Sequence, residues 1–155
     1  LPQSNQKHRN WVSFYCKERL VPQFQAAINQ NLLTKADVPG IDVLQNVISS
    51  CCSEIRPSLL HGDLWGGNYV INEAGVPYLI DPAVYFGHSE IDMAMSKLFG
   101  GFGVPFYDAY YDINPSMPGE ASRTAIYQLY YLLVHLNLFG RSYHRSVKEI
   151  LQTHF

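Results

Sequence analysis

Charged residues are scarce in this sequence, and no segment is strongly basic. They make up 15% of the 155 residues, and 11 Lys and Arg against 13 Asp and Glu give a net charge of −2. Globular proteins usually carry about a quarter charged residues. Because a chain without a basic surface attracts neither nucleic acid nor an anionic membrane, we expect neither as a partner. Hydrophobic residues reach 47%, which excludes an intrinsically disordered chain.

Cysteines are few, and long apolar runs are missing. Cys16, Cys51 and Cys52 are odd in number and have no C-x-x-C spacing. They fit neither a disulfide framework nor a zinc site, so we expect reduced thiols and a cytoplasmic location. The most apolar segment, residues 130–138, is short and is interrupted by a histidine and an asparagine. It cannot form a membrane-spanning helix.

Hydrophobic periodicity predicts a mainly helical α+β fold with a small β region near the middle of the chain. Strands are expected over residues 58–61, 69–72 and 78–80, the last two forming a hairpin around a turn at residues 72–75. Pro22 is expected to kink or restart the first helix, and Ser89 is expected to cap the helix that begins there. Helices are expected over residues 9–31, 43–53, 89–99, 105–111, 119–139 and 142–152.

The residues with the clearest chemical potential lie on these short β elements. The segment HGDLWGGN, residues 61–68, has the pattern H-x-D-L-x-x-x-N, and Asp81 ends the hairpin's second strand. Since a hairpin returns the chain on itself, Asp81 should lie beside Asn68, and their oxygens are ligands that Mg²⁺ prefers. Asp63 would then accept a proton from a substrate hydroxyl, as in the catalytic loop of kinases. The alternative is a tight turn in which Asp63 and Asn68 bond their own backbone.

Together with two later segments, these residues resemble the fructosamine/ketosamine kinase family. The matching segments are HGDLWGGN at 61–68, DPA at 81–83, EIDMA at 90–94 and LFGGF at 98–102. That family belongs to the aminoglycoside-phosphotransferase-like branch of the protein-kinase-like fold. The resemblance covers most of the chain. It implies ATP-dependent phosphorylation of a sugar hydroxyl on ketoamines, either fructosamines or ribulosamines, in the repair of glycated proteins.

The resemblance also implies roles for individual residues. It makes Asp63 the catalytic base, and it makes Asn68 and Asp81 the ligands of the Mg²⁺ that bridges the ATP phosphates. The remaining candidates are His61 and Asp92 as supports of the catalytic loop, and Trp65, His88 and Glu90 around the substrate cleft.

The segment upstream of His61 does not look like a nucleotide-binding lobe. Its 60 residues contain no G-x-G-x-x-G, and none of its lysines lies on a predicted strand. We therefore expect residues 1–155 to be a single domain, the helical C-terminal lobe of a kinase-like phosphotransferase. The N-terminal nucleotide lobe would be absent from this chain and present in its parent. The expected partners are ATP and a ketoamine, either a small molecule or a glycated protein lysine.

Two other functions stay open at this point. One is an aminoglycoside- or choline-type small-molecule kinase of the same fold. The other is a non-catalytic kinase-like binding module, which the absence of a nucleotide lobe would favour. The presence of Asp63, Asn68 and Asp81 favours a catalytic protein instead.

Overall fold

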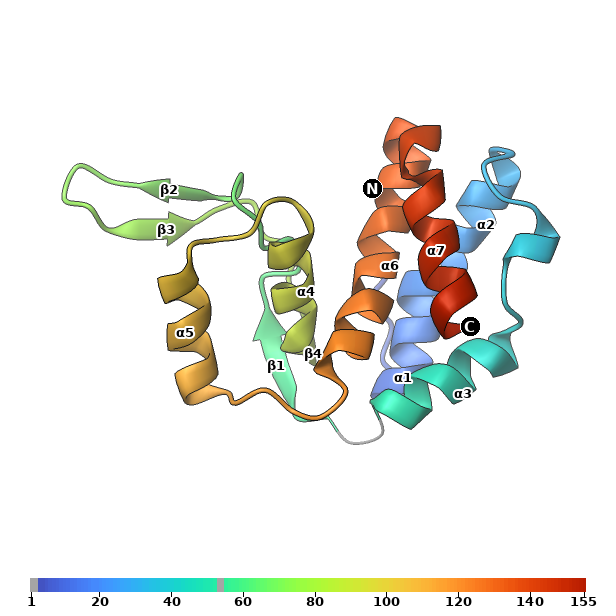
Figure 1. Cartoon of the computed structure of the whole chain (residues 1–155), viewed down its shortest axis with the longest axis horizontal. Helices are drawn as coiled ribbons and strands as arrows, with labels where there is room; N and C mark the ends of the chain where they lie inside the picture. The colour runs from blue at the N-terminus through green and yellow to red at the C-terminus, as the bar shows by residue number, and fades with distance from the viewer. Residues whose placement is uncertain (1–2, 53–54) are drawn as a thin grey trace. The chain divides into compact units, whose positions relative to one another are not determined.

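The computed structural model describes residues 3–52 and 55–155, and it confirms a mainly helical α+β fold (Figure 1). The helices are α1 (Trp11–Phe14), α2 (Val21–Asn29), α3 (Ile41–Cys51), α4 (Glu90–Leu98), α5 (Val104–Ile113), α6 (Glu120–Phe139) and α7 (His144–His154). The strands are β1 (Pro57–Leu60), β2 (Tyr69–Ile71), β3 (Pro77–Leu79) and β4 (Tyr85–His88). A π-helical segment, Tyr15–Leu20, joins α1 to α2, and short 3₁₀ turns are formed by Lys35–Asp37 and Arg141–Tyr143.

The chain divides into two compact units. The helical unit consists of Leu1–Ile55 and Ala125–Phe155, and the hairpin unit consists of Arg56–Thr124. All the candidate site residues named above lie in the hairpin unit. In the described part of the chain, no helix is both long and apolar enough to cross a membrane.

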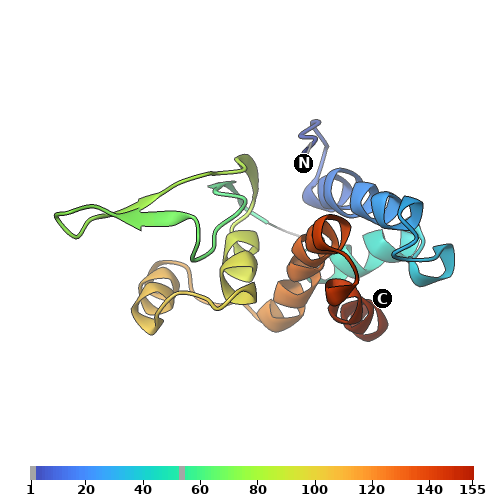
Figure 2. The ribbon, with the colours of Figure 1, turned by 90° about the horizontal axis from the view of Figure 1, so that it is seen from above.

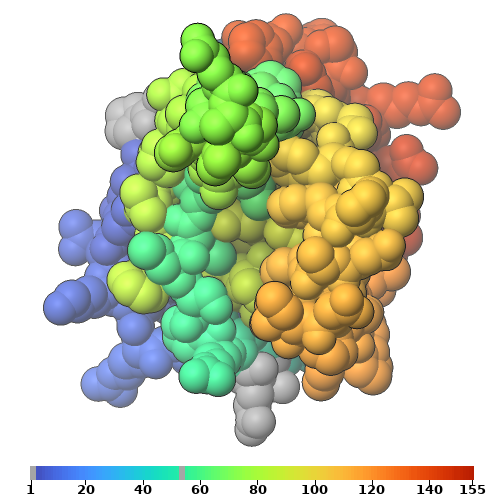
Figure 3. Space-filling view, turned by 90° about the vertical axis from the view of Figure 1, so that its left-hand side faces the viewer, coloured from blue at the N-terminus to red at the C-terminus, as the bar shows by residue number. Residues whose placement is uncertain are grey.

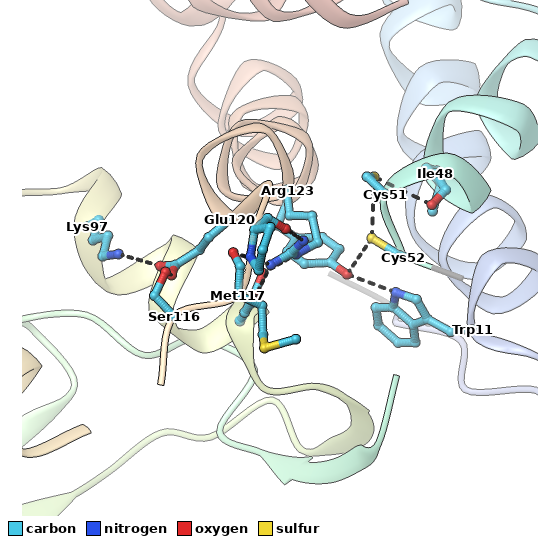
Figure 4. Close-up of polar contacts among 12 residues, drawn as sticks. Trp11, Ile48, Cys51, Cys52, Lys97, Ser116, Met117, Glu120 and Arg123 are labelled. Carbon is cyan, nitrogen blue, oxygen red and sulfur yellow. Dashed lines mark hydrogen bonds and ion pairs between the residues drawn. The ribbon is translucent and has the colours of Figure 1, made fainter. Parts of the chain in front are cut away.

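Aromatic side chains form the centre of the helical unit. The Tyr15 hydroxyl donates to the Ile126 carbonyl at 3.0 Å, and the Trp11 indole N–H donates to the Tyr127 hydroxyl at 3.0 Å. Cys52 Sγ lies 3.1 Å from the same hydroxyl, and burial raises the pKa of Tyr127 (Figure 4). Figures 1 and 2 both show α6 and α7 running side by side in this unit. These contacts give the helical unit a core of its own.

The first helical segment and α3 follow the sequence closely. Pro22 lies in the first turn of α2, directly after the π-helical segment; Leu20 and Val21 keep helical dihedrals, so the hydrogen-bond pattern changes before Pro22 and the predicted restart is wrong. Pro22 has no N–H to donate to a carbonyl of the preceding turn, and it stands where the π-helical pattern gives way to the α-helical one. The described part of α3 ends at Cys51, and its predicted end at Ser53 lies outside the described residues.

Two antiparallel strand pairs organise the hairpin unit. In the first, β1 pairs with β4, so that Leu60 lies opposite Tyr85 and both are buried. The strand β4 was not expected from the sequence, which predicted a return to helix after residue 82. In the second, β2 pairs with β3, and both strands are exposed along their length. Figures 1 and 2 show this hairpin extending away from the rest of its unit.

The turn between β2 and β3 is closed by one side chain. Asn72 Oδ1 accepts from the N–H groups of Ala74 and Val76 at 3.0 and 2.9 Å. Gly75 has φ +79°, the left-handed conformation that glycine adopts without steric cost. The hairpin predicted from the sequence is therefore confirmed, with its turn chemistry.

Helix α4 is the buried element of the hairpin unit. Every residue from Glu90 to Ser96 is buried. Figure 3 shows a hollow between the green β1 segment and the orange α5, and the yellow α4 forms its floor. Gly100 and Gly101, with φ +90° and +69°, end the helix as predicted. The predicted cap by Ser89 is wrong, because this residue already has helical dihedrals and its side chain bonds no N–H of the first turn.

Candidate functional site

Residues 61–68, here called the Asp63 loop, begin directly after β1 and are fixed by a carboxylate from α4. Asp92 Oδ2 accepts from the His61 N–H and Asp92 Oδ1 accepts from the Gly62 N–H, both at 2.8 Å. Burial raises the pKa of Asp92, and these two amide hydrogen bonds oppose the rise. The backbone of the loop is therefore fixed to the most buried helix of the unit.

Gly62 is required by this geometry. Its φ is +81°, and a Cβ at this position would lie 2.1 Å from the Ala83 carbonyl oxygen. The strand after the hairpin thus passes directly against the loop, and the Ala83 N–H donates to the His61 carbonyl at 2.8 Å. A side chain at residue 62 would separate the two segments.

Asp63 and Asn68 lie side by side. Asn68 Nδ2 donates to the Asp63 carboxylate Oδ2 and to the Asp63 carbonyl, both at 2.9 Å. Asn68 is 8% exposed, whereas Asp63 is half-buried. Both amide hydrogens of Asn68 are directed to Asp63, so Asn68 Oδ1 is the atom that can bind a cation. Among the described residues, none hydrogen bonds to Asp63 Oδ1.

His61 connects the loop to the end of the hairpin. His61 Nδ1 accepts from the Asp63 N–H at 3.3 Å, and His61 Nε2 donates to the Ile80 carbonyl at 2.9 Å. The Ile80 N–H in turn donates to the Asn68 carbonyl at 3.0 Å. These bonds require the Nε2–H tautomer of the imidazole. They bring residue 81 to the Asp63 loop, as the hairpin argument predicted.

Asp81 has the properties of an exposed oxygen ligand. It adopts a left-handed φ of +51°, which Asp tolerates better than most residues, and its carboxylate forms no hydrogen bond or ion pair with any described residue. Within residues 3–52 and 55–155, no three His, Cys, Asp or Glu side chains group as a metal cage. Mg²⁺ is usually held by one or two protein oxygens together with substrate phosphates and water. Asn68 and Asp81 fit that donor set.

Trp65 projects from the same loop and is 37% exposed. Gly67 lies under its ring, since a Cβ at Gly67 would lie 2.4 Å from the indole. On the other side, the Phe99 ring meets Trp65 edge to face, with ring centroids 6.5 Å apart. The loop therefore presents a large, fixed and accessible aromatic ring next to Asp63.

His88 ends β4 and Glu90 begins α4, so neither residue belongs to the Asp63 loop itself. The buried Glu90 carboxylate forms a two-point ion pair with Arg123, at 2.6 and 2.7 Å. Arg123 also donates to the carbonyls of Pro118 and Met117, so it ties α4 to the segment before α6. Burial lowers the pKa of His88, while Glu90 opposes this. Arg123 could not be identified from the sequence, because no local pattern marks the partner of a buried carboxylate.

A second polar cluster lies on the α5 side of α4. Lys97 Nζ donates to the Tyr111 hydroxyl at 2.6 Å and to Glu120 Oε1 at 3.1 Å, and Ser116 also bonds Glu120 (Figure 4). Burial by itself lowers the pKa of Lys97. The hydrogen bonds to Tyr111 and Glu120 outweigh this effect, so the pKa of Lys97 is raised overall. These side chains, with Ala121 and Thr124, line an open pocket of about 540 Å³. The charges of Lys97 and Glu120 neutralise each other in this ion pair. We therefore interpret the cluster as structural and not as a second reactive centre.

Known proteins with similar sequences cover the whole of the chain. The family model for fructosamine kinase matches residues 1–155. The "Probable ketoamine kinase" of Lactiplantibacillus plantarum is 42% identical over 153 residues, which are 97% of this chain and 55% of that protein. The "Ketosamine-3-kinase" of Mus musculus is 38% identical over 159 residues, covering 98% and 49% of the two chains.

A solved structure agrees with the sequence comparisons. The crystal structure of a fructosamine-3-kinase candidate from Thermobifida fusca YX-ER1 has a TM-score of 0.84 and 32% identity to this chain. The match covers 98% of this chain and 53% of that one. The chain thus spans about half the length of the relatives it matches. With a family model that matches from the first residue to the last, the chain belongs to the fructosamine kinase family.

Proposed function

We propose that the protein containing this chain is an ATP-dependent kinase that phosphorylates a sugar hydroxyl of ketoamines, as a step in the repair of glycated proteins. One observation carries the proposal. The Asp63 carboxylate is held by Asn68 on a loop whose backbone is fixed by the buried Asp92. Membership of the fructosamine kinase family supports the choice of a ketoamine as acceptor.

In this proposal Asp63 is the general base. Asn68 holds one carboxylate oxygen, Oδ2, while Oδ1 receives no hydrogen bond from the described residues and can accept one from an incoming hydroxyl. As the acceptor oxygen attacks the γ-phosphoryl group, its proton passes to Asp63 Oδ1. His61 and Asp92 do not meet the substrate, and instead keep the loop in the conformation that presents this oxygen.

Asn68 Oδ1 and the Asp81 carboxylate would hold Mg²⁺ next to Asp63. The ion would supply positive charge to the phosphates of ATP. The absence of hydrogen bonds to the Asp81 carboxylate from described residues supports this role. A DPA sequence, Asp81-Pro82-Ala83, occupies the position after the hairpin, and the bond from the Ala83 N–H to the His61 carbonyl holds Asp81 close to the loop.

We further propose that residues 1–155 are the C-terminal lobe of this kinase and that a nucleotide-binding lobe is part of the parent chain. The chain's coverage of about half of its relatives supports this arrangement.

The three cysteines, all within the described residues, form no disulfide, which is typical of a reducing compartment such as the cytoplasm.

A panel of acceptors tests the proposed function. The full-length protein is incubated with γ-labelled ATP and Mg²⁺, and with fructosyl-lysine, ribulosyl-lysine, unmodified lysine, an aminoglycoside or choline. We expect label on one or both ketoamines and none on the other compounds. Preferential labelling of the aminoglycoside or choline would identify the other small-molecule kinase class. No labelling of any acceptor would favour a non-catalytic module.

A further inference from the structure

Two partly exposed aromatic rings lie close to Asn68 in sequence, Trp65 on the Asp63 loop and Tyr69 at the start of β2. Trp65 and Tyr69 are each 37% exposed, and they come before and after the turn formed by Gly66 and Gly67. Large aromatic rings are usually covered in a folded unit, because each contributes a large apolar area. Trp65 belongs to the same loop as Asp63, and Tyr69 follows directly after Asn68, which bonds the Asp63 carboxylate, so both rings come from the segment that carries the reactive group.

The segment that follows α4 extends this surface. Residues 99–103 contain Phe99, which meets Trp65, and Phe102, whose ring centroid lies 5.6 Å from that of Tyr69. A Cβ on Gly66 would lie 3.9 Å from the Gly101 carbonyl oxygen, so the two glycine-containing segments run close together. Phe102 thus stands beside the Asp63 loop although it is far from that loop in sequence.

A single hydroxyl fixes residues 99–103 in this position. The Tyr107 hydroxyl accepts from the Phe102 N–H at 3.1 Å and lies 3.3 Å from Ser96 Oγ on α4. A Cβ on Gly101 would lie 3.0 Å from the same hydroxyl, so the segment passes directly over it. The Phe102 ring also packs on Phe106, with centroids 4.4 Å apart. Tyr107 therefore determines where Phe102 stands.

We propose that Tyr69 and Phe102, next to Trp65, form the surface on which the carbon skeleton of the acceptor packs, and that Tyr107 is the positioning residue of this surface. The inference rests on the proposed function. A hydroxyl that reacts at Asp63 must lie within hydrogen-bond reach of it, and the exposed rings of Trp65 and Tyr69 on the same segment offer the rest of the acceptor an apolar surface. The C–H faces of a sugar and the methylenes of a lysine are apolar and match aromatic faces.

Three variants of the full-length protein test this surface. Phe102→Leu and Tyr69→Leu keep an apolar side chain but remove the ring. We expect the Kd of fructosyl-lysine, from calorimetry without nucleotide, and its KM to rise about tenfold. The KM for ATP should stay within about twofold. Tyr107→Phe removes one oxygen and should raise the acceptor KM about threefold to tenfold, with kcat changed less.

A matched control lies on the same helix. The Tyr111 hydroxyl bonds Lys97 and Glu120 and forms no hydrogen bond with residues 99–103, all of which the structure describes, so Tyr111→Phe should leave both KM values unchanged. Unchanged acceptor binding in Phe102→Leu and Tyr69→Leu would overturn the inference. A rise in the KM for ATP instead of the acceptor would assign the rings to the adenine base and overturn it as well.

The same experiment separates this inference from the proposed function. Phosphorylation of fructosyl-lysine by the wild-type protein tests the function, whereas the ratio of variant to wild-type binding tests the surface. If the wild type phosphorylates a different acceptor, a tenfold ratio for that acceptor would retain the surface and reject the ketoamine. If the wild type neither binds nor phosphorylates any acceptor of the panel, both proposals are wrong.

Discussion

Asp92 shows how one buried carboxylate can hold a reactive loop. Both of its oxygens accept backbone N–H groups of the Asp63 loop, and the residue is 9% exposed. Hydrogen bonds to a charged group contribute about 1.5–3 kcal/mol each, more than neutral ones. The His61 and Gly62 N–H groups would otherwise lack an acceptor at a place where water has little access. These two hydrogen bonds offset the cost of burying the Asp92 carboxylate, and they also hold the loop in one conformation.

Replacing Asp92 with Asn should therefore damage both stability and turnover. The amide can accept one of the two N–H groups and presents its own NH₂ to the other. We expect the free energy of unfolding to fall by about 2 kcal/mol and kcat to fall as the loop loses its geometry. Urea denaturation and steady-state kinetics measure the two effects. The exposed Asp42 provides the control, since Asp42→Asn should change neither quantity. An Asp92→Asn protein with wild-type stability would contradict this account.

Asp81 should behave differently, because its carboxylate is exposed and has no described protein partner. Asp81→Asn keeps a residue that tolerates the left-handed φ but removes the negative charge. We expect the Mg²⁺ concentration for half-maximal activity to rise about tenfold or more, with much of the rate restored at high Mg²⁺. The check is a Mg²⁺ titration of activity, with Asp108→Asn on the exposed face of α5 as control. Equal Mg²⁺ dependence in wild type and Asp81→Asn would remove Asp81 from the metal site.

At the scale of elements, one glycine, Gly62, allows two segments to lie against each other. The segment around Ala83, which follows the hairpin, can approach the Asp63 loop because Gly62 has no side chain. Gly62 and Gly75 have nearly the same φ, +81° and +79°, but only Gly62 faces another segment at the position of a Cβ. Gly75→Ala should cost about 1 kcal/mol for the backbone conformation alone. Gly62→Ala should cost roughly 3–5 kcal/mol because the Ala83 carbonyl must also move. Denaturation midpoints compare the two variants, and equal losses would show that the contact with Ala83 is easily relaxed.

The turn before α3 gives the helical unit a dependence on pH. Asp37 bonds Lys148 of α7 and accepts from the Thr34 hydroxyl and N–H, and these interactions hold the pKa of Asp37 well below its usual range. A lowered folded-state pKa contributes stability above the unfolded value of about 3.9. That stability is lost as the pH falls below that value.

A Lys148→Met variant should therefore have a shallower acid limb. Exposed pairs contribute about 0–1 kcal/mol, so its Tm at neutral pH should be lower by roughly 1–4 °C. The difference from wild type should shrink as the pH is lowered from about 5 to 2, because protonation of Asp37 in the unfolded chain removes the stability that its lowered folded-state pKa supplies. Thermal melts across this range measure the effect. A constant difference in Tm at all pH values would show that Lys148 acts through packing and not through Asp37.

Much of this local structure could be predicted from the sequence, and the exceptions have physical causes. Turn residues between two β-branched and aromatic runs marked the β2–β3 hairpin, and its return explained why residue 81 meets the Asp63 loop. The strand β4 was missed because YFGH is short, contains Gly87 and pairs with a distant segment. Ser89 could not be excluded as a cap, because the sequence does not show that its backbone is already helical.

At the scale of the whole molecule, four of the few charged residues lie inside the protein and are used there. Arg19, Glu90, Asp92 and Arg123 are all buried. The pair of Glu90 and Arg123 holds the hairpin unit together, and Asp92 holds the reactive loop of the same unit. Pairing and hydrogen bonding make such burial possible, whereas an unpaired charge would cost several kcal/mol. A low charge content is thus compatible with a site built on charged side chains.

The measurement that tests the central claim most directly is transfer of labelled phosphate from ATP to a ketoamine by the full-length protein, wild type against Asp63→Asn. The amide keeps the shape of the side chain but cannot accept the acceptor's proton. We predict a fall in kcat of about 10²- to 10⁴-fold with the KM for ATP largely kept, and no change in the control Asp108→Asn. An Asp63→Asn protein that turns over near the wild-type rate would contradict the role of Asp63 as the base.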